Sequence, residues 1–368
     1  MAQFAFVSEM RSTNRIVCCI GLAVLLMMAA CVGDHKNRCI SFSNESNVDR
    51  LSGILCEAEN MPFLKSLVVI QDGKVVIEKY MHGGAPDQAI DLRSASKSIL
   101  SAVLGIAIRD GYIKGIDQKV MDFFPEYPLD ELDPRIASLA IEHLVTMTSG
   151  FAVTENAKTY QFLYESSDWI GYILHLPMDA NPGEKFNYLS FNTHLLSAII
   201  TRATGMSTLA YTKQVLFSPL SIDQVIWEQG PQGYYIGGWA MSLKAREMAN
   251  FGLLYLNNGK IGQIQVVPPD WVKQSTAEHS GMVGTYYSRW DKNYGYGYLW
   301  WIRRLAKDID IPFALGHGGQ RIVILTKANS VIVTQADPSV DSSSSHKNHR
   351  AIDSLIFCSL SGYLLQTK

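Results

Sequence analysis

The chain has 368 residues, of which 47% are hydrophobic and 18% are charged, and its formal net charge is -2. This length and composition predict a globular protein with a sizeable core, built as one large domain or two interleaved ones. The near-neutral charge gives no electrostatic case for binding nucleic acid or an anionic membrane surface. The sequence also lacks an internal repeat and metal-ligand patterns such as paired CxxC or HExxH, so we expect neither a metal nor a cofactor.

The N-terminus has the features of a bacterial export signal. Two arginines precede the apolar run 16–30, which at roughly 15 residues is short for a spanning helix of about 20. The order Met-Ala-Ala-Cys at 28–31 resembles a lipobox, with Met in the place of the usual Leu. We therefore predict that residues 1–31 are a signal, that Cys31 is lipidated, and that the protein is exported to the periplasm or outer membrane. Ordinary signal cleavage or an uncleaved anchor is the alternative.

Three further cysteines follow this signal. Cys39 and Cys56 could pair in an oxidising compartment. Cys358 lies in an apolar helical pattern and is interpreted as a small buried hydrophobic residue.

The first half of the mature chain predicts a tether, a hairpin and a helix. Residues 32–60 begin with a polar stretch and are interpreted as a tether. Two apolar runs flank Asp72-Gly73 between residues 66 and 80, which is a strong hairpin signal. Apolar residues at helical spacing predict a helix from 96 to 110, ending before Gly111.

Helical patterns dominate from 112 to about 229, and strand patterns return afterwards. The predicted late elements are strands at 294–301, 322–326 and 331–334 and an amphipathic helix at 350–365. This order predicts an α+β fold in which both chain ends build an antiparallel sheet. The predicted sheet domain comprises 61–103 and 230–368, and the helical insertion domain comprises 104–229.

The first chemical motif is Ser94-Ala95-Ser96-Lys97. Positions i and i+3 share a helix face, so a serine at the helix start has a lysine amine within reach. Lysine can activate a serine only if burial or a neighbour lowers its pKa. An N-cap role for Ser94 is the structural alternative. The same spacing recurs at Ser344–Lys347, within a serine-rich run that favours a solvated loop.

Two further motifs could complete a site. Tyr188 lies two residues before Ser190, between Pro182-Gly183 and an apolar helical pattern. Its phenol could relay a proton, although a half-buried structural tyrosine is the commoner case. Gly316-His317-Gly318-Gly319-Gln320 leads into a strand, where glycines would let the strand edge approach a substrate. A glycine-rich turn with a surface histidine is the alternative.

The three motifs in this order resemble the serine β-lactamase-related family, which includes class C β-lactamases, DD-peptidases and esterases. Within that family the chain is most similar to the 6-aminohexanoate-dimer hydrolase branch. The segments that carry the resemblance are 93–98, 186–193, 237–239, 251–252, 294–297 and 316–320. The resemblance implies a β-lactamase/transpeptidase-like fold.

The resemblance also implies roles for the site residues. Ser94 would attack a carbonyl, while Lys97 and Tyr188 carry its proton. The backbone N–H groups of Ser94 and Gln320 would form the oxyanion hole, and water would release the acyl group. Ser190 and His317, with Gly318 and Gly319, would contact the substrate.

Two departures from class C β-lactamases bear on the substrate. Ser190 stands where those enzymes have Asn, and His317-Gly318-Gly319 stands where they have Lys-Thr-Gly. The missing lysine removes a cation near the substrate carboxylate, so small esters or linear amides are the predicted substrates. A D,D-peptidase, D-amino-acid hydrolase or β-lactamase is the alternative, and a binding protein on the same fold is a second one.

The segment 286–301 contains eight aromatic residues. They could form a wall of the acyl pocket. Packing on one strand face is favoured, because positions 294, 296, 298 and 300 alternate along the predicted strand.

Overall fold

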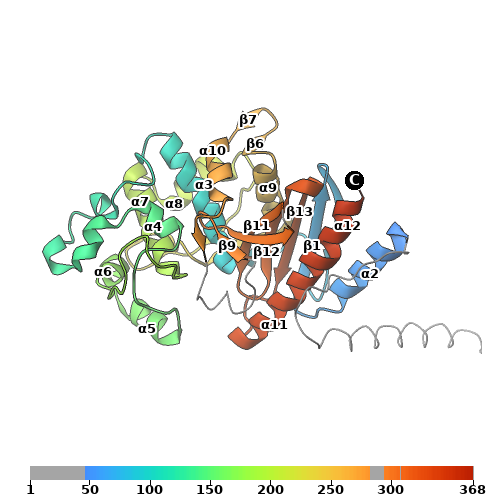
Figure 1. Cartoon of the computed structure of the whole chain (residues 1–368), viewed down its shortest axis with the longest axis horizontal. Coiled ribbons are helices and arrows are strands. Elements are labelled where there is room, and N and C mark those ends of the chain that lie inside the picture. The colour runs from blue at the N-terminus through green and yellow to red at the C-terminus, as the bar shows by residue number, and fades with distance from the viewer. Residues whose placement is uncertain (1–45, 282–293, 307, 368) are drawn as a thin grey trace, which may run out of the picture. The chain divides into compact units, whose positions relative to one another are not determined.

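Strands from both ends of the chain form one antiparallel sheet. The structure is a computed structural model that describes residues 46–281, 294–306 and 308–367. The sheet has eight strands in the order β2-β1-β13-β12-β11-β10-β9-β8, so the first strands lie beside the last one (Figure 1). Its strands are β1 (Leu64–Gln71), β2 (Lys74–Tyr80), β8 (Ser280–Gly281), β9 (Tyr294–Tyr296), β10 (Trp301–Ala306), β11 (Ile309–Gly316), β12 (Gln320–Leu325) and β13 (Ser330–Ala336). The predicted α+β arrangement is confirmed.

Helices cover both faces of this sheet. Every residue of β12 and β13 is buried, which explains their continuous apolar sequences. On one face, Gly252 of α9 lies so close to Val331 that a Cβ would be 2.4 Å from its Cγ1. On the other face, a Cβ on Gly319 would be 2.4 Å from Ile352 Cδ1 of α11, the helix that crosses the front of the sheet in Figure 1.

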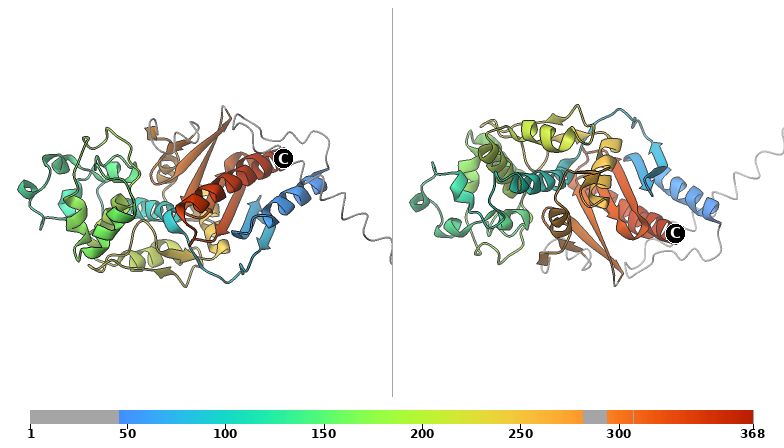
Figure 2. Two further views of the ribbon diagram at one scale, coloured as in Figure 1. Left: turned by 90° about the horizontal axis from the view of Figure 1, so that it is seen from below. Right: turned by 90° about the horizontal axis from the view of Figure 1, so that it is seen from above.

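The helices between residues 141 and 212, green in Figure 2, gather at the opposite end from the first and last helices. The α-helices are α2 (Asn47–Glu59), α3 (Ser96–Arg109), α4 (Ile141–Val145), α5 (Ala157–Glu165), α6 (Trp169–Leu174), α7 (Ser190–Thr204), α8 (Thr208–Thr212), α9 (Ala245–Leu256), α10 (Pro269–Ser275), α11 (Ser342–Asp353) and α12 (Ser361–Gln366). The short strands β3 (Ile90–Asp91), β5 (Met241–Leu243) and β4 (Ile226–Trp227) form a second sheet, and β6 (Lys260–Ile261) pairs with β7 (Ile264–Gln265). Helix α3 is buried along nearly its whole length and contacts both α7 and β11.

Two predicted elements are confirmed almost residue for residue. Strands β1 and β2 form the hairpin, and Asp72 and Gly73 both have positive φ, as a tight hairpin turn requires. Helix α3 ends at Arg109, and Gly111 follows with a φ of 78°.

Residues 47–59, in the second half of the predicted tether, form helix α2. Ser46 caps this helix by accepting a hydrogen bond from the Asp49 N–H, and Ile54 and Ala58 are buried. Cys56 is exposed on α2. The predicted signal, Cys31 and Cys39 lie outside the described residues, so the lipid anchor and the Cys39–Cys56 disulfide stay predictions. In the part of the chain that the structure describes, no helix is long and apolar enough to cross a membrane.

The predicted strand 294–301 is wrong as one continuous strand. Residues 294–296 form β9, and a tight turn leads back into the antiparallel strand β10, which begins at Trp301. In this turn the Gly297 N–H donates to the Trp300 carbonyl at 2.8 Å. Leu299 has a φ of 63°, so its backbone reverses direction where the alternation of aromatic residues suggested continuity. Tyr298 and Trp300 therefore lie in the turn. The aromatic residues at 286, 287 and 290 lie outside the described residues.

The C-terminal helical region begins eight residues before the predicted start at 350. Asp341 caps α11 by accepting a hydrogen bond from the Ser344 N–H at 3.0 Å, so the serine-rich run forms a helical turn and the predicted loop is wrong. A π-helical segment, Ser354–Leu360, then joins α11 to α12. Strand β11 was not predicted. Phe42–Lys368 packs as one unit. The predicted boundaries between the sheet domain and the helical insertion domain stay predictions.

Candidate active site

Ser94 lies on a one-turn 3₁₀ helix, Arg93–Ala95, that leads directly into α3. Ser94 is half-buried and is not the N-cap of α3, a role held by Ala95. Arg93, the preceding residue, has a φ of 51°, which is a strained conformation for a residue with a side chain. Asp91 stabilises it by accepting a hydrogen bond from the Arg93 N–H at 2.8 Å. The chain therefore turns sharply just before Ser94 and holds it at the end of a buried helix.

Lys97 is fully buried beneath Ser94. Its Nζ lies 2.8 Å from Ser94 Oγ, 2.9 Å from Ser190 Oγ and 2.8 Å from the Gly238 carbonyl oxygen. Burial lowers the pKa of Lys97 from 10.5 to about 8, although the charge of Glu155 raises it in part. Much more of this lysine is neutral near pH 7 to 8 than of an exposed one, and only the neutral amine can accept a proton from Ser94.

Two glycines bring the third partner of Lys97 into place. A Cβ on Gly237 would be 1.9 Å from the Thr193 carbonyl oxygen, and a Cβ on Gly238 would be 2.8 Å from Ser190 Cβ. No side chain fits at either position without a shift of the backbone. This close approach to the first turn of α7 places the Gly238 carbonyl oxygen within hydrogen-bond distance of Lys97 Nζ.

Tyr188 lies beside the same lysine. Lys97 Nζ is 5.1 Å from the centre of the Tyr188 ring, within the range of a cation–π contact. The ring also packs against Trp301, with centroids 5.3 Å apart, and against Tyr296. Ser94, Lys97, Tyr188 and Ser190 are thus brought together.

The third predicted motif, residues 316–320, borders the site, but most of its polar groups bond to other parts of the chain. A Cβ on Gly316, at the end of β11, would be 2.1 Å from the Leu92 carbonyl oxygen, so this strand end adjoins the turn before Ser94. The His317 Nε2 lies 2.7 Å from the Val340 carbonyl oxygen, and Gln320, paired with Gly316 in the ladder, turns its side chain to the backbone of Ala336.

Gly318 and Gly319 have structural contacts with the C-terminal region. The Gly318 N–H donates to Ser345 Oγ at 2.9 Å, and its carbonyl accepts from Asn348. The Gly319 carbonyl accepts from Thr334. Their contact with substrate, like the oxyanion role of Gln320, stays a prediction.

The family that this chain matches agrees with this geometry. A model of the Beta-lactamase family matches residues 65–342. The chain belongs to this family. It is 26% identical over 284 residues to the 6-aminohexanoate-dimer hydrolase of Paenarthrobacter ureafaciens, an alignment that covers 73% of this chain and 71% of that one.

Solved structures of the same family share the fold. A candidate 6-aminohexanoate-dimer hydrolase from Bacillus anthracis matches with a TM-score of 0.67 and 21% identity, over 85% of this chain and 82% of that one. An octameric penicillin-binding protein homologue from Pyrococcus abyssi matches with a TM-score of 0.67 and 16% identity, over 88% and 78%. The predicted β-lactamase/transpeptidase-like fold is confirmed, and the protein is a serine hydrolase of the Beta-lactamase family.

Several residues at the site were not singled out from the sequence. Glu155, on the loop before α5, accepts hydrogen bonds from both the backbone N–H and the hydroxyl of Ser190. Tyr160 and Trp239 form an aromatic wall beside it, with ring centres 5.3 Å apart, and Tyr160 also packs on Phe191. A loop glutamate and two scattered aromatic residues carry no periodic signal. Of these three residues, only Trp239 lies in a segment that carries the family resemblance, residues 237–239.

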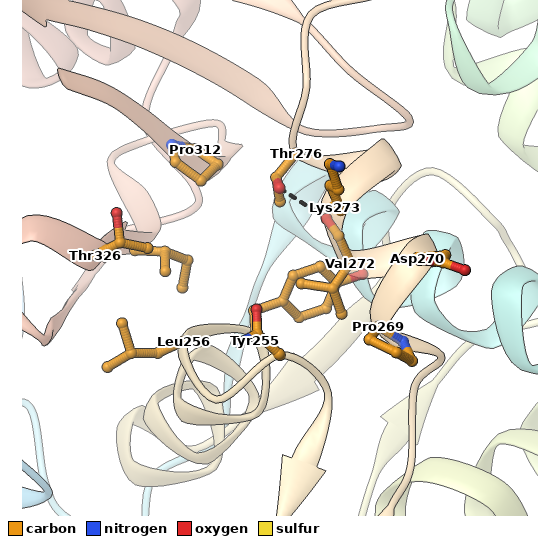
Figure 3. A pocket seen from close by; sticks show the side chains of 11 residues that line it. Tyr255, Leu256, Pro269, Asp270, Val272, Lys273, Thr276, Pro312 and Thr326 are labelled. Carbon is orange, nitrogen blue, oxygen red and sulfur yellow. Dashed lines mark hydrogen bonds between the residues drawn. The ribbon is translucent and has the colours of Figure 1, made fainter. Parts of the chain in front are cut away.

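A surface pocket elsewhere in the molecule is separate from these residues. It has a volume of about 360 Å³ and lies between α9, α10 and the strands β11 and β12 (Figure 3). Asp270, Lys273 and Thr276 line it, and the Thr276 hydroxyl is held by the Val272 carbonyl at 2.7 Å. None of the predicted site residues is part of its lining, so this pocket is not the predicted active site.

Proposed function

We propose that this family member hydrolyses small esters or linear amides through an acyl-enzyme on Ser94. The observation that carries the proposal is the contact of Ser94 Oγ with Lys97 Nζ at 2.8 Å, made by a lysine whose pKa burial lowers to about 8. A weak nucleophile and a buried amine at this distance form a nucleophile–base pair.

The proposed reaction has two halves. Ser94 Oγ forms a bond to the substrate carbonyl carbon while its proton passes to neutral Lys97, and backbone N–H groups of Ser94 and Gln320 would stabilise the oxyanion. Collapse of this intermediate breaks the ester or amide bond, and the leaving group takes a proton from Lys97 or through Tyr188. Water then adds to the acyl carbon and gives a proton to the same groups. Collapse of this second intermediate breaks the bond between the acyl carbon and Ser94 Oγ, which takes that proton back as the acid leaves.

The charges around the site support a neutral substrate over one with a carboxylate beside the scissile bond. Arg321, which follows the predicted substrate-binding segment on β12, is fully buried and pairs with Asp353 at 3.0 Å. Arg93 pairs with Asp91 at 3.2 Å, and His317 is engaged with the Val340 carbonyl. Arg321 and Arg93 thus each pair with a carboxylate of their own, and His317 is held by a backbone carbonyl.

The name of the curated relative supports a linear amide as one of the substrates. That enzyme is a hydrolase of a 6-aminohexanoate dimer. Fold alone does not determine substrate, so this likeness supports a class of bond and not a particular molecule.

The test compares kcat/KM for p-nitrophenyl butyrate, a linear anilide and nitrocefin. We expect the ester to exceed nitrocefin by roughly ten-fold or more, since losing one charge-assisted hydrogen bond costs about 1.5–3 kcal/mol. His317→Lys should narrow this gap by restoring a cation, while His317→Gln serves as the uncharged control. A nitrocefin value equal to or above the ester value in the wild-type enzyme would place the protein among the β-lactamases.

A further inference from the structure

Glu155 lies on the far side of Ser190 from Lys97. Its Oε2 accepts the Ser190 hydroxyl at 3.2 Å, and its Oε1 accepts the Ser190 backbone N–H. The loop that carries it is held in place by Asn187, whose Nδ2 donates to the carbonyls of Phe151 at 2.9 Å and Val153 at 2.8 Å. Asn187 immediately precedes Tyr188, so this loop is fixed to the same segment that carries the site residues.

Two arrangements of the hydrogen bonds around neutral Lys97 are possible, and Glu155 selects between them. A neutral amine has two hydrogens and one lone pair, and Nζ has three neighbours, Ser94 Oγ, Ser190 Oγ and the Gly238 carbonyl. A carbonyl can only accept, whereas a hydroxyl can donate or accept. The lone pair can therefore face either Ser94, which is productive, or Ser190, which is not.

We infer that Glu155 is a positioning residue that directs the lone pair of Lys97 at Ser94. Because the carboxylate of Glu155 takes the hydroxyl hydrogen of Ser190, Ser190 can only accept from Lys97. Both amine hydrogens are then used by Ser190 and Gly238, and the lone pair is left for Ser94. This inference rests on the proposed nucleophile–base pair of Ser94 and Lys97.

A purely electrostatic role for Glu155 predicts the opposite effect. The charge of Glu155 raises the pKa of Lys97, against the larger effect of burial. Removing that charge should lower the pKa of Lys97 and leave more neutral amine at pH 7. If charge were all that Glu155 supplied, Glu155→Gln would therefore be more active below pH 8.

The neighbouring phenols leave this reasoning intact. The pKa of Tyr160, on α5 beside Glu155, is raised well above its ordinary value by burial and then by the charge of Glu155, so it stays protonated in the working range. Tyr188 presents the face of its ring to Lys97. Tyr160 therefore faces Glu155 and Ser190 as a protonated hydroxyl.

The Glu155→Gln substitution should reverse this arrangement of hydrogen bonds. Its amide oxygen must stay on the Ser190 N–H, which is a donor, so its NH₂ group faces the Ser190 hydroxyl. Ser190 then accepts from Gln and gives its own hydrogen to the lone pair of Lys97. The base is turned away from Ser94 although the side chain keeps its shape.

The experiment measures kcat and KM for p-nitrophenyl butyrate from pH 6 to 10 in the wild type, Glu155→Gln, Ser190→Ala and the double variant. We expect Glu155→Gln to lower the kcat plateau by roughly ten-fold or more. KM should stay within about three-fold, and the acid limb should move to lower pH. In the Ser190→Ala background the same change should have little effect, because Glu155 acts through Ser190. Glu165→Gln on exposed α5, where Glu165 accepts from Gln161 at 2.8 Å, is the matched control and should behave as wild type.

Two outcomes would overturn the inference. One is a Glu155→Gln plateau equal to or above that of the wild type, and the other is an equal loss with and without Ser190. Thermal melts identify variants that fail to fold, and in that case the Glu155→Asp variant should show a smaller loss with the same dependence on Ser190. Fluorophosphonate labelling of wild-type Ser94 tests the nucleophile separately, so a failure of the proposed function is distinguishable.

Discussion

The sequence contains the spacing Ser-x-x-Lys in two regions that the structure treats very differently. Ser94 and Lys97 lie where a strained turn meets α3, and Lys97 is 1% exposed with three hydrogen-bond partners. Ser344 and Lys347 lie in the first two turns of α11, where Lys347 is exposed. There the Ser344 hydroxyl donates to Asp341 Oδ2 at 2.9 Å and serves the helix cap.

This difference shows what the spacing alone supplies. In both regions it places a hydroxyl and an amine on one face of a helix. At Ser94, burial lowers the pKa of the Lys97 amine and fixed acceptors orient it toward the hydroxyl, whereas Lys347 is exposed. The chemistry therefore depends on the elements packed around the motif, above all the first turn of α7 and the Gly237-Gly238 approach.

The largest expected effect separates the two serines. Ser94→Ala should lower kcat for an ester by at least about 10⁴-fold and abolish fluorophosphonate labelling, because the nucleophile is lost. Ser344→Ala, the matched control, should retain wild-type turnover and labelling. Peptide mapping that places the label on Ser344, or turnover that survives in Ser94→Ala, would reject the assignment.

The second comparison separates the two lysines by rate and by pH. Lys97→Ala should lower kcat/KM by roughly 10² or more, as expected for loss of a positioned base. In the wild type, kcat/KM should rise with pH through about 8, the pKa to which burial lowers Lys97, because the base is active only when neutral. Lys347→Ala should leave both the rate and the acid limb unchanged. An acid limb that persists in Lys97→Ala would assign this titration to another group.

The sequence was sufficient to predict those parts of the fold and site that depend on local pattern. The Asp72-Gly73 hairpin, the extent of α3 and the Ser94–Lys97 pair follow from turn chemistry and helical spacing. The turn at Leu299 could not be predicted, because a positive φ at leucine depends on tertiary contacts.

Contacts between distant segments explain the rest. Glu155 reaches Ser190 across 35 residues, and the Gly238 carbonyl reaches Lys97 across 141. A single sequence contains no pattern that predicts either of these contacts. The serine-rich start of α11 was misjudged because serine is a poor helix former, and the cap from Asp341 outweighed that propensity.

The smallest expected effect concerns stability. Because the pKa of Lys97 is about 8 in the folded protein and 10.5 as the ordinary value, the unfolded chain binds more protons between these values. The cost of burying the lysine is therefore complete below about pH 8 and disappears as the pH rises through 10.5. Relative to Lys97→Met, whose side chain has a similar shape and no charge, the wild type should gain roughly 2 kcal/mol of unfolding free energy between pH 7 and 9.5.

The measurement that checks this is the difference in denaturant unfolding free energy between the two proteins at each pH. Working with the difference removes the titration of all groups that the two proteins share. The stability at pH 7 alone is less informative, since Lys97→Met also leaves Ser190 and the Gly238 carbonyl without the amine they contact, and this offsets the relief of removing a buried charge. Lys347→Met, the same substitution at an exposed lysine, is the matched control. Parallel pH profiles for wild type and Lys97→Met would mean that Lys97 keeps its ordinary pKa in the folded protein, and the distinction between the two lysines would then rest on position alone.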